Sequence, residues 1–268
     1  MKKNDFYDID FDSKIKPKKN LGQHWLKDET VLKEIISLLD IKNDETIVEI
    51  GPGKGALTKY LIKERIKLIA IEYDESIIPY LSKKLNSEKF QIINSDFLEY
   101  NLEDLPKDYK IIGNIPYYIT GKIIKNCLVT NNKPSLIVLL IQKEVAERLV
   151  SKPGEMSILS TMSQFYSDIK LGPVIEVEKF DPSPKVDSQV VIIKPNNNSY
   201  DQTFQKSFER VVKAGFSARR KKLHTALSGG LNISINDAKD LLSKVNINSN
   251  LRAQDLAIDD WLKLAKLI

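Results

Sequence analysis

The chain has very few residues of the kinds that form disulfides or bind soft metals. Among its 268 residues there is a single cysteine, Cys127, and there are two histidines, His24 and His224. One cysteine excludes an intramolecular disulfide and a cysteine-cluster metal site, and it fits a reducing compartment. Two histidines give little basis for a zinc enzyme. We therefore expect no metal in this protein.

Long apolar runs are also missing. No stretch approaches the roughly 18 consecutive apolar residues of a membrane helix. The charged start of the chain lacks the apolar core of a signal peptide. The composition, 42% hydrophobic and 29% charged, is typical of a soluble globular protein. We expect a cytoplasmic protein without a membrane partner, with a monomer as the default state.

Short apolar runs alternate with segments of helical periodicity over the first half of the chain. This alternation predicts a mostly parallel sheet with helices on both faces, which is a Rossmann-like α/β fold. Two later runs, 168–177 and 188–195, are typical of a closing antiparallel pair. The expected buried strands lie at 45–51, 67–74, 90–97, 109–114 and 135–142.

The last part of the chain shows only helical patterns. A proline, three asparagines and a serine before it indicate a linker. We expect a Rossmann-like domain over residues 1–195, with a basic arm at 1–20. A linker at 196–202 and a small helical domain at 203–268 follow.

A glycine loop follows the first strong strand. Gly51, Gly53 and Gly55 end this strand and open a helix, an arrangement that lets a backbone approach a ligand. Glu72 lies 21 residues past Gly51 at the next strand end, where a carboxylate can hold ribose hydroxyls. The alternative for the loop alone is a tight turn. Together these residues predict a nucleoside-containing cofactor, and they do not distinguish NAD from S-adenosylmethionine.

Polar residues also end the third and fourth strands. Asp96 is placed to accept a hydrogen bond from an adenine amino group, or, alternatively, to cap the following helix. The fourth strand ends in Asn114-Ile115-Pro116-Tyr117. An Asn oxygen and a carbonyl freed by the proline can accept hydrogen bonds from an adenine amino group that is to be methylated, and Tyr117 can stack on the base. A proline turn with a buried tyrosine is the alternative; the next residue, Tyr118, we interpret as packing.

Nearly the whole chain resembles the S-adenosylmethionine-dependent ribosomal RNA adenine N6-dimethyltransferases. The resemblance includes KKNLGQHWLKD, VEIGPGKGALT, IAIEYD, NSDFL, GNIPYYIT, LIQKEVAERL, FDPSPKVDSQVV and FSARRKKLHTAL, in this order. It implies a class I methyltransferase fold with a seven-stranded sheet and S-adenosylmethionine as methyl donor. His24 and Trp25 stand where Asn and Phe are also common in the family.

The resemblance also implies the site residues. Asn114 would bridge the cofactor and the target base, and Tyr117 and Phe180 would flank that base. The cofactor-binding residues would be His24, Leu26, Gly51, Gly53, Glu72, Asp96 and Asn114.

Two branches of this family act on different RNAs. Pro52, PSPKVDSQVV and RRKKLHTAL resemble the small-subunit branch, which dimethylates two adjacent adenosines in the 3′-terminal hairpin of 16S rRNA. The partner implied is 16S rRNA within an immature small subunit. The alternative is a large-subunit enzyme that confers macrolide resistance. Rivals of other classes are a non-catalytic RNA-binding factor on the same fold and an NAD-dependent oxidoreductase, for which no hydride-transfer constellation is found.

The segment 204–227 is strongly basic around an apolar stripe. It holds seven cations against one acid, whereas the net charge of the chain is +5. A solvated helix face is the alternative. We expect RNA-phosphate contacts, led by the run Arg219, Arg220, Lys221 and Lys222.

Overall fold

The computed structural model describes residues 15–18, 21–85, 87–196 and 200–268. Their contacts divide the chain into two compact units: Met1–Ala146 with Ile169–Pro195, and Glu147–Asp168 with Asn196–Ile268. The expected basic arm at 1–20 therefore falls mostly outside the described residues. Residues 197–199 of the expected linker also lie outside them.

The first unit is built around a seven-stranded sheet with the order β4-β3-β2-β5-β6-β9-β7. The pairs β2–β3, β3–β4, β2–β5 and β5–β6 are parallel, and β6–β9 is antiparallel. The predicted α/β class with a mostly parallel sheet is confirmed. The strands are β2 (Thr46–Ile50), β3 (Lys67–Glu72), β4 (Phe90–Asn94), β5 (Lys110–Asn114), β6 (Leu136–Gln142), β7 (Ser167–Ile175) and β9 (Ser188–Pro195).

A separate two-stranded sheet pairs β1 (Trp25–Leu26) with β8 (Phe180–Asp181) in antiparallel register. Trp25 lies opposite Asp181, and Leu26 lies opposite Phe180. This pairing joins the GQHWL segment to the FDPSP segment, more than 150 residues later in the chain.

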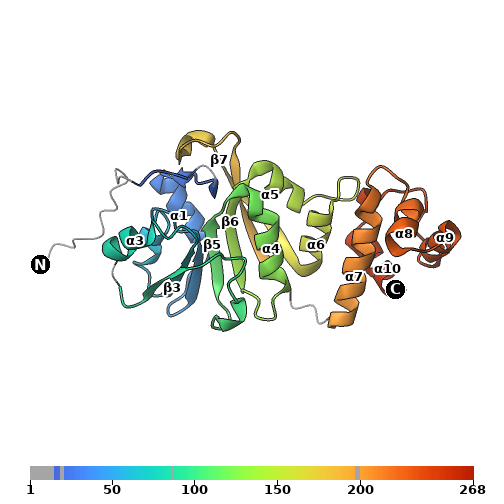
Figure 1. Ribbon diagram of the computed structural model, residues 1–268, viewed down its shortest axis with the longest axis horizontal. Helices are drawn as coiled ribbons and strands as arrows, with labels where there is room; N and C mark the ends of the chain where they lie inside the picture. Colours follow the sequence, from blue (N-terminus) through green and yellow to red (C-terminus); the bar gives the residue numbers. More distant parts are fainter. Residues whose placement is uncertain (1–14, 19–20, 86, 197–199) are drawn as a thin grey trace, which may run out of the picture. The chain divides into compact units, whose positions relative to one another are not determined.

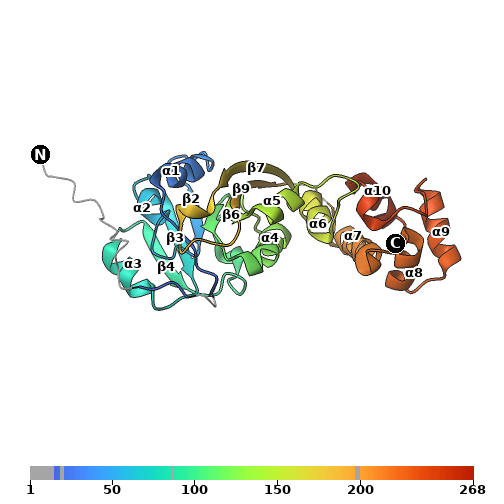
Figure 2. The ribbon, with the colours of Figure 1, turned by 90° about the horizontal axis from the view of Figure 1, so that it is seen from above.

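Helices cover both faces of the large sheet, and Figures 1 and 2 show α1 and α4 on opposite sides of it. Asp28 caps α1 by accepting hydrogen bonds from Thr30 N and Val31 N. The apolar side of α1 packs with Ile47, Leu68 and Val138 in one buried cluster. Since the strands are covered on both faces, they consist of continuous apolar runs. The helices of this unit are α1 (Glu29–Ser37), α2 (Thr58–Leu61), α3 (Ile78–Lys84) and α4 (Thr120–Val129). The boundary between the two units falls within α5 (Lys143–Leu149).

The second unit is helical. The α6 helix belongs to it, although the sequence placed these residues in the first domain, because Phe165 of α6 stacks on Phe208 of α7 with ring centroids 3.8 Å apart. Gly215 ends α7, where a Cβ would lie 2.3 Å from the Trp261 ring of α10. The helices are α6 (Ile158–Tyr166), α7 (Gln202–Gly215), α8 (Leu223–Leu231), α9 (Ile235–Lys244) and α10 (Ile258–Ala265).

Short 3-10 helices join several elements: η2 (Leu102–Asp104), η3 (Tyr117–Ile119), η4 (Val177–Lys179), η5 (Phe216–Ala218) and η6 (Ala253–Asp255). Of these, η3 follows β5 directly and leads into α4, so the GNIPYY segment runs from a strand into a helical stretch. Within the described ranges, no helix combines the length and apolar character needed to span a membrane.

Candidate active site

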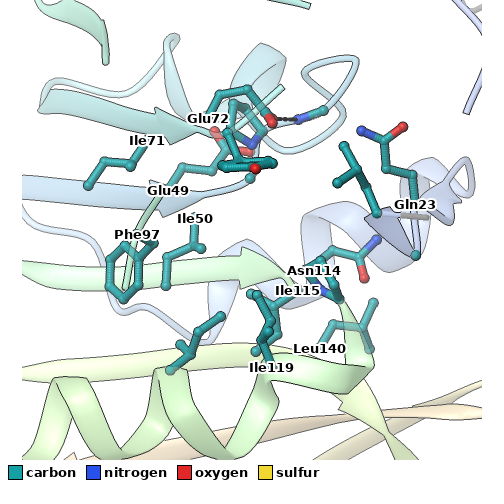
Figure 3. Close-up of a pocket in the computed structure, with 18 of the residues that line it drawn as sticks. Gln23, Glu49, Ile50, Ile71, Glu72, Phe97, Asn114, Ile115, Ile119 and Leu140 are labelled. Carbon is teal, nitrogen blue, oxygen red and sulfur yellow. Dashed lines mark hydrogen bonds between the residues drawn. The ribbon is translucent and has the colours of Figure 1, made fainter. Parts of the chain in front are cut away.

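A pocket of about 350 Å³ lies in the first unit, at the carboxyl ends of β2, β3 and β5. Figure 3 shows Glu72 at the end of β3 and Asn114 at the end of β5, with Gln23 across the opening; β2 lies between these two strands in the sheet. The carboxyl edge of an open α/β sheet is where such folds bind ligands. The pocket brings together eight of the predicted site residues: His24, Leu26, Gly51, Gly53, Glu72, Asp96, Asn114 and Tyr117.

The glycine loop forms one wall of the pocket. Gly51 and Gly53 both have positive φ, at 62° and 54°, in the left-handed region that favours glycine. A Cβ at Gly51 would meet nothing within 4 Å, so the space beside this backbone is open. A Cβ at Gly53 would lie 2.9 Å from Trp25 Nε1. Glycine at 53 is therefore required by the close approach of an indole as well as by its φ.

Trp25 contributes an unusual group to this wall. Its indole nitrogen is buried and has no hydrogen-bond partner among the described residues. The Lys54 ammonium lies 4.3 Å from the centre of its ring, at cation–π distance. From the sequence, Trp25 was expected only to stand where Phe is also common in the family, without a role in the site.

Glu72 is held at the end of β3 by backbone donors. Gly53 N donates to its Oε2 at 3.1 Å, and Asp74 N donates to its Oε1 at 2.7 Å. Burial raises the pKa of this carboxyl, while the two backbone donors oppose the shift. The carboxylate is thus oriented toward the glycine loop, where ribose hydroxyls could bind it.

A second carboxyl, Glu49, lies at the base of the pocket near the end of β2. It is 1% exposed, and Thr58 Oγ1 donates a hydrogen bond of 2.7 Å to its Oε2. Burial, together with the nearby Glu72 charge, raises the pKa of Glu49 to about 8, while the Thr58 hydrogen bond opposes the shift. At neutral pH this carboxyl is therefore mostly protonated.

Asp96 lines the pocket and caps a turn, where the sequence had suggested a helix cap as one alternative. Its Oδ1 accepts a hydrogen bond from Leu98 N at 2.8 Å, which closes a turn; no helix follows at 97–100. Asp96 also lines the pocket. The second carboxylate oxygen is not engaged by any described donor and can face a ligand.

Asn114 ends β5 with a defined amide orientation. Its Nδ2 donates a hydrogen bond of 2.7 Å to the carbonyl oxygen of His24. Only the amide nitrogen can donate to a carbonyl, so this bond determines which end of the amide is oxygen. The Oδ1 atom thus remains available to accept a hydrogen bond in the pocket.

Tyr117 is tethered at its hydroxyl. The Tyr117 and Ser188 hydroxyl oxygens are 2.7 Å apart. The His24 imidazole is nearly parallel to the Tyr117 ring, with an interplanar angle of 16° and a centroid distance of 6.0 Å. Its Nδ1 lies 2.7 Å from the Pro182 carbonyl, so this nitrogen carries a proton and donates. Ser188 carries no sequence signal that would have identified it.

Two aromatic residues lie in surroundings that the sequence did not indicate. Phe180 does not line the pocket; it is 2% exposed and belongs to the buried cluster of α1 and the sheet. Its ring therefore has no face open to a base in this conformation. Tyr118, which we interpreted as packing, is 66% exposed and lines the pocket.

The basic run lies in the second unit. Arg219, Arg220, Lys221 and Lys222 are all exposed, in the connection between η5 and α8. Lys222 Nζ donates to Asn250 Oδ1 at 2.8 Å. The apolar stripe expected on the preceding helix is largely buried, including Phe208, Val211 and Val212. The run is thus accessible to a polyanion.

The pocket fits a nucleoside-containing cofactor. The open space at Gly51 provides room for a ligand. The carboxylate of Glu72 and the second oxygen of Asp96 provide acceptors for hydroxyl and amino groups. In the part of the chain that the structure describes, no group of three or more His, Cys, Asp or Glu side chains could hold a metal ion.

Solved structures share this fold. A dimethyladenosine transferase from Plasmodium falciparum superposes with a TM-score of 0.77 at 24% identity, covering 89% of this chain and 95% of that one. The 23S rRNA methyltransferase ErmE superposes with a TM-score of 0.69 at 21% identity, covering 90% and 98%. Both are class I methyltransferases in fold, as the sheet order here indicates.

Sequence relatives cover most of the chain. A protein named ribosomal RNA small subunit methyltransferase A from Dehalococcoides mccartyi is 38% identical over 93% of this chain and 88% of its own length. Proteins of the same name from Nostoc sp. and Francisella tularensis are 38% and 36% identical, each over 95% of this chain and 98% of the relative. The family model described as ribosomal RNA adenine dimethylase matches residues 14–268. The resemblance inferred from the motifs is thereby confirmed, and the chain belongs to the ribosomal RNA adenine dimethylase family.

Proposed function

We propose that this protein transfers methyl groups from S-adenosylmethionine to N6 of two adjacent adenosines in the 3′-terminal hairpin of 16S rRNA, within an immature small ribosomal subunit. The names of the relatives support the small-subunit substrate. The observation that carries the chemistry is the hydrogen bond from Asn114 Nδ2 to the His24 carbonyl, which leaves Asn114 Oδ1 as an acceptor in the pocket.

The cofactor is held by the ends of three strands. Glu72 accepts hydrogen bonds from the ribose hydroxyls, and Asp96 accepts one from the adenine amino group. The backbone at Gly51 leaves room for the methionine part of the cofactor. His24, Leu26 and Gly53 complete the wall. When bound, S-adenosylmethionine supplies an electrophilic methyl group on sulfur.

Asn114 prepares the target nitrogen. The lone pair of an adenine amino group is delocalised into the ring, so the nitrogen is a poor nucleophile. Asn114 Oδ1 and the carbonyl oxygen of Ile115, the residue before Pro116, accept hydrogen bonds from the two amino N–H groups and favour a more tetrahedral nitrogen. No described residue donates a hydrogen bond to the Ile115 carbonyl. The product ammonium is acidic enough to lose its proton to water.

The RNA is held by stacking and by charge. Tyr117 offers its tethered ring to the flipped adenine. Phe180 reaches the base only if the segment 180–183 rearranges when RNA binds. The exposed cations at 219–222 belong to the second, helical unit and contact phosphates. The protein acts as a cytoplasmic monomer.

Label transfer from S-adenosylmethionine tests this proposal. Unmodified small subunits and unmodified large-subunit RNA are offered separately, and the labelled nucleosides are identified after digestion. We expect N6-dimethyladenosine at the two hairpin adenosines. Label only in large-subunit RNA would assign the protein to the macrolide-resistance branch, and absence of cofactor binding in calorimetry would favour a non-catalytic RNA-binding factor.

A further inference from the structure

The two tyrosines of GNIPYY occupy different environments. Tyr117 points inward to Ser188, whereas Tyr118 is 66% exposed at the same pocket. Both lie on η3, where consecutive side chains are about 120° apart because a 3-10 helix has roughly three residues per turn. One helical turn therefore presents one aromatic ring inside the pocket and the next ring at its opening.

The Tyr118 ring lies against a glycine, and a lysine that lines the same pocket follows it in the chain. A Cβ added at Gly22 would stand 3.6 Å from Tyr118 Cε1, which is ordinary contact distance. Because Gly22 has no side chain, it covers little of the ring. Lys122 lies four residues later, in the first turn of α4; like Tyr118 it is exposed and lines the pocket.

An exposed aromatic ring and an ammonium that line the same pocket match the chemistry of a nucleotide. The ring can stack on any base, and the ammonium can contact a phosphate. A nucleotide next to a flipped base has lost its own stacking partner, which makes it the natural occupant of such a ring. We propose that Tyr118 stacks on the nucleotide adjoining the target adenosine and that Lys122 contacts its phosphate. This inference rests on the proposed function.

Fluorescence of a base analogue tests the contact directly. Each of the two hairpin adenosines is replaced in turn by 2-aminopurine, which lacks the 6-amino group, so that the remaining adenosine is the only one that can be methylated. Binding to the full-length protein should quench the analogue by stacking. Quenching should persist in Tyr118→Phe, which keeps an aromatic ring, and be lost in Tyr118→Leu, which keeps only apolar bulk.

Turnover provides the second measurement. At saturating S-adenosylmethionine, Tyr118→Leu should lower kcat/KM for RNA by about 5- to 150-fold, the equivalent of one lost base stack. Tyr118→Phe should stay within about twofold of the wild type. Lys122→Gln should make the slope of log K for RNA binding against log salt concentration shallower by about 0.7. Lys125 is an exposed α4 lysine outside the pocket lining, and Lys125→Gln should not change this slope.

The possible outcomes distinguish failure of this inference from failure of the proposed function. Equal quenching and equal kcat/KM in the wild type and Tyr118→Leu would overturn the role of Tyr118 alone. A loss confined to S-adenosylmethionine affinity would also overturn it. If the wild type transferred no methyl groups to the hairpin, the proposed function would fail, and this inference would fail with it.

Discussion

The hydroxyl oxygens of Tyr117 and Ser188 are 2.7 Å apart, although the residues are separated by 71 positions in the chain. Tyr117 follows β5, Ser188 opens β9, and β6 lies between these two strands in the sheet. Ser188 is fully buried, so its hydroxyl has little access to water as an alternative partner. Burial raises the pKa of Tyr117, whose phenol therefore remains neutral and protonated at physiological pH. The bond restricts rotation of the ring that faces the pocket.

Loss of this tether should affect RNA use more than cofactor binding. We expect Ser188→Ala to destabilise the fold by about 1–3 kcal/mol, because the Tyr117 hydroxyl loses its partner. Its kcat/KM for RNA should fall, and its S-adenosylmethionine affinity should not. Tyr117→Phe should have a similar effect. Ser188→Thr keeps a hydroxyl at this position and should therefore retain the activity that Ser188→Ala loses. Steady-state kinetics on the two single variants and the double variant give the coupling; strictly additive effects would show that the two hydroxyls act independently.

Asn114→Ala should remove methyl transfer while leaving most of the cofactor affinity. The variant loses the Oδ1 acceptor, and the His24 carbonyl loses the amide that donates to it at 2.7 Å. A loss of about 100-fold or more in kcat is expected for a group that acts in the transition state. Single-turnover transfer and calorimetry measure the two properties separately. Normal transfer by Asn114→Ala would show that this amide does not prepare the target nitrogen.

Gly53→Ala should destabilise the protein and weaken cofactor binding. The new methyl group would lie 2.9 Å from Trp25 Nε1, and residue 53 would keep a φ of 54°. We expect a loss of about 2–4 kcal/mol from the sum of left-handed strain and overpacking. Urea unfolding measures it. The control is Gly154→Ala, where φ is 104° but no atom lies within 4 Å; it should show strain without any change in cofactor affinity.

The buried carboxyl Glu49 should make stability fall as pH rises. Its pKa is about 8 in the folded state and near its ordinary value of 4.5 in the unfolded state. Between these values the folded state holds a proton that the unfolded state has released, so the free energy of unfolding decreases with pH by a total on the order of a few kcal/mol. Glu49→Gln keeps an oxygen for the Thr58 hydroxyl and removes the titrating proton.

Urea unfolding between pH 5 and pH 8.5 measures this effect. The Glu49→Gln variant should show a flatter profile than the wild type and gain stability relative to it at the upper end. Glu64→Gln, which changes an exposed carboxyl of the same unit, should follow the wild-type profile. The opposite result would be a wild-type free energy of unfolding that rises across this range, with the same profile in Glu49→Gln. It would mean that Glu49 is already ionised in the folded state.

Local patterns were sufficient to place most of the pocket. The alternation of apolar runs and helical segments predicted the parallel strands. Because parallel strands end at one edge of a sheet, Glu72, Asp96 and Asn114 could be expected to meet there. Phe180 could not be placed in this way. It lies on a short strand paired with β1, and only packing decides whether its ring faces the pocket or the core.

The sequence by itself determined the fold class, the glycine loop and the series of polar strand ends, because periodicity and turn residues act over a few neighbouring positions. Tertiary structure alone decided which groups those residues meet. The amide of Asn114 is oriented by a carbonyl 90 residues earlier, and Tyr117 is tethered by a hydroxyl 71 residues later. Such contacts depend on the order of strands in the sheet. In the GNIPYY segment, therefore, only the tertiary structure decides that Tyr117 faces inward and Tyr118 faces outward.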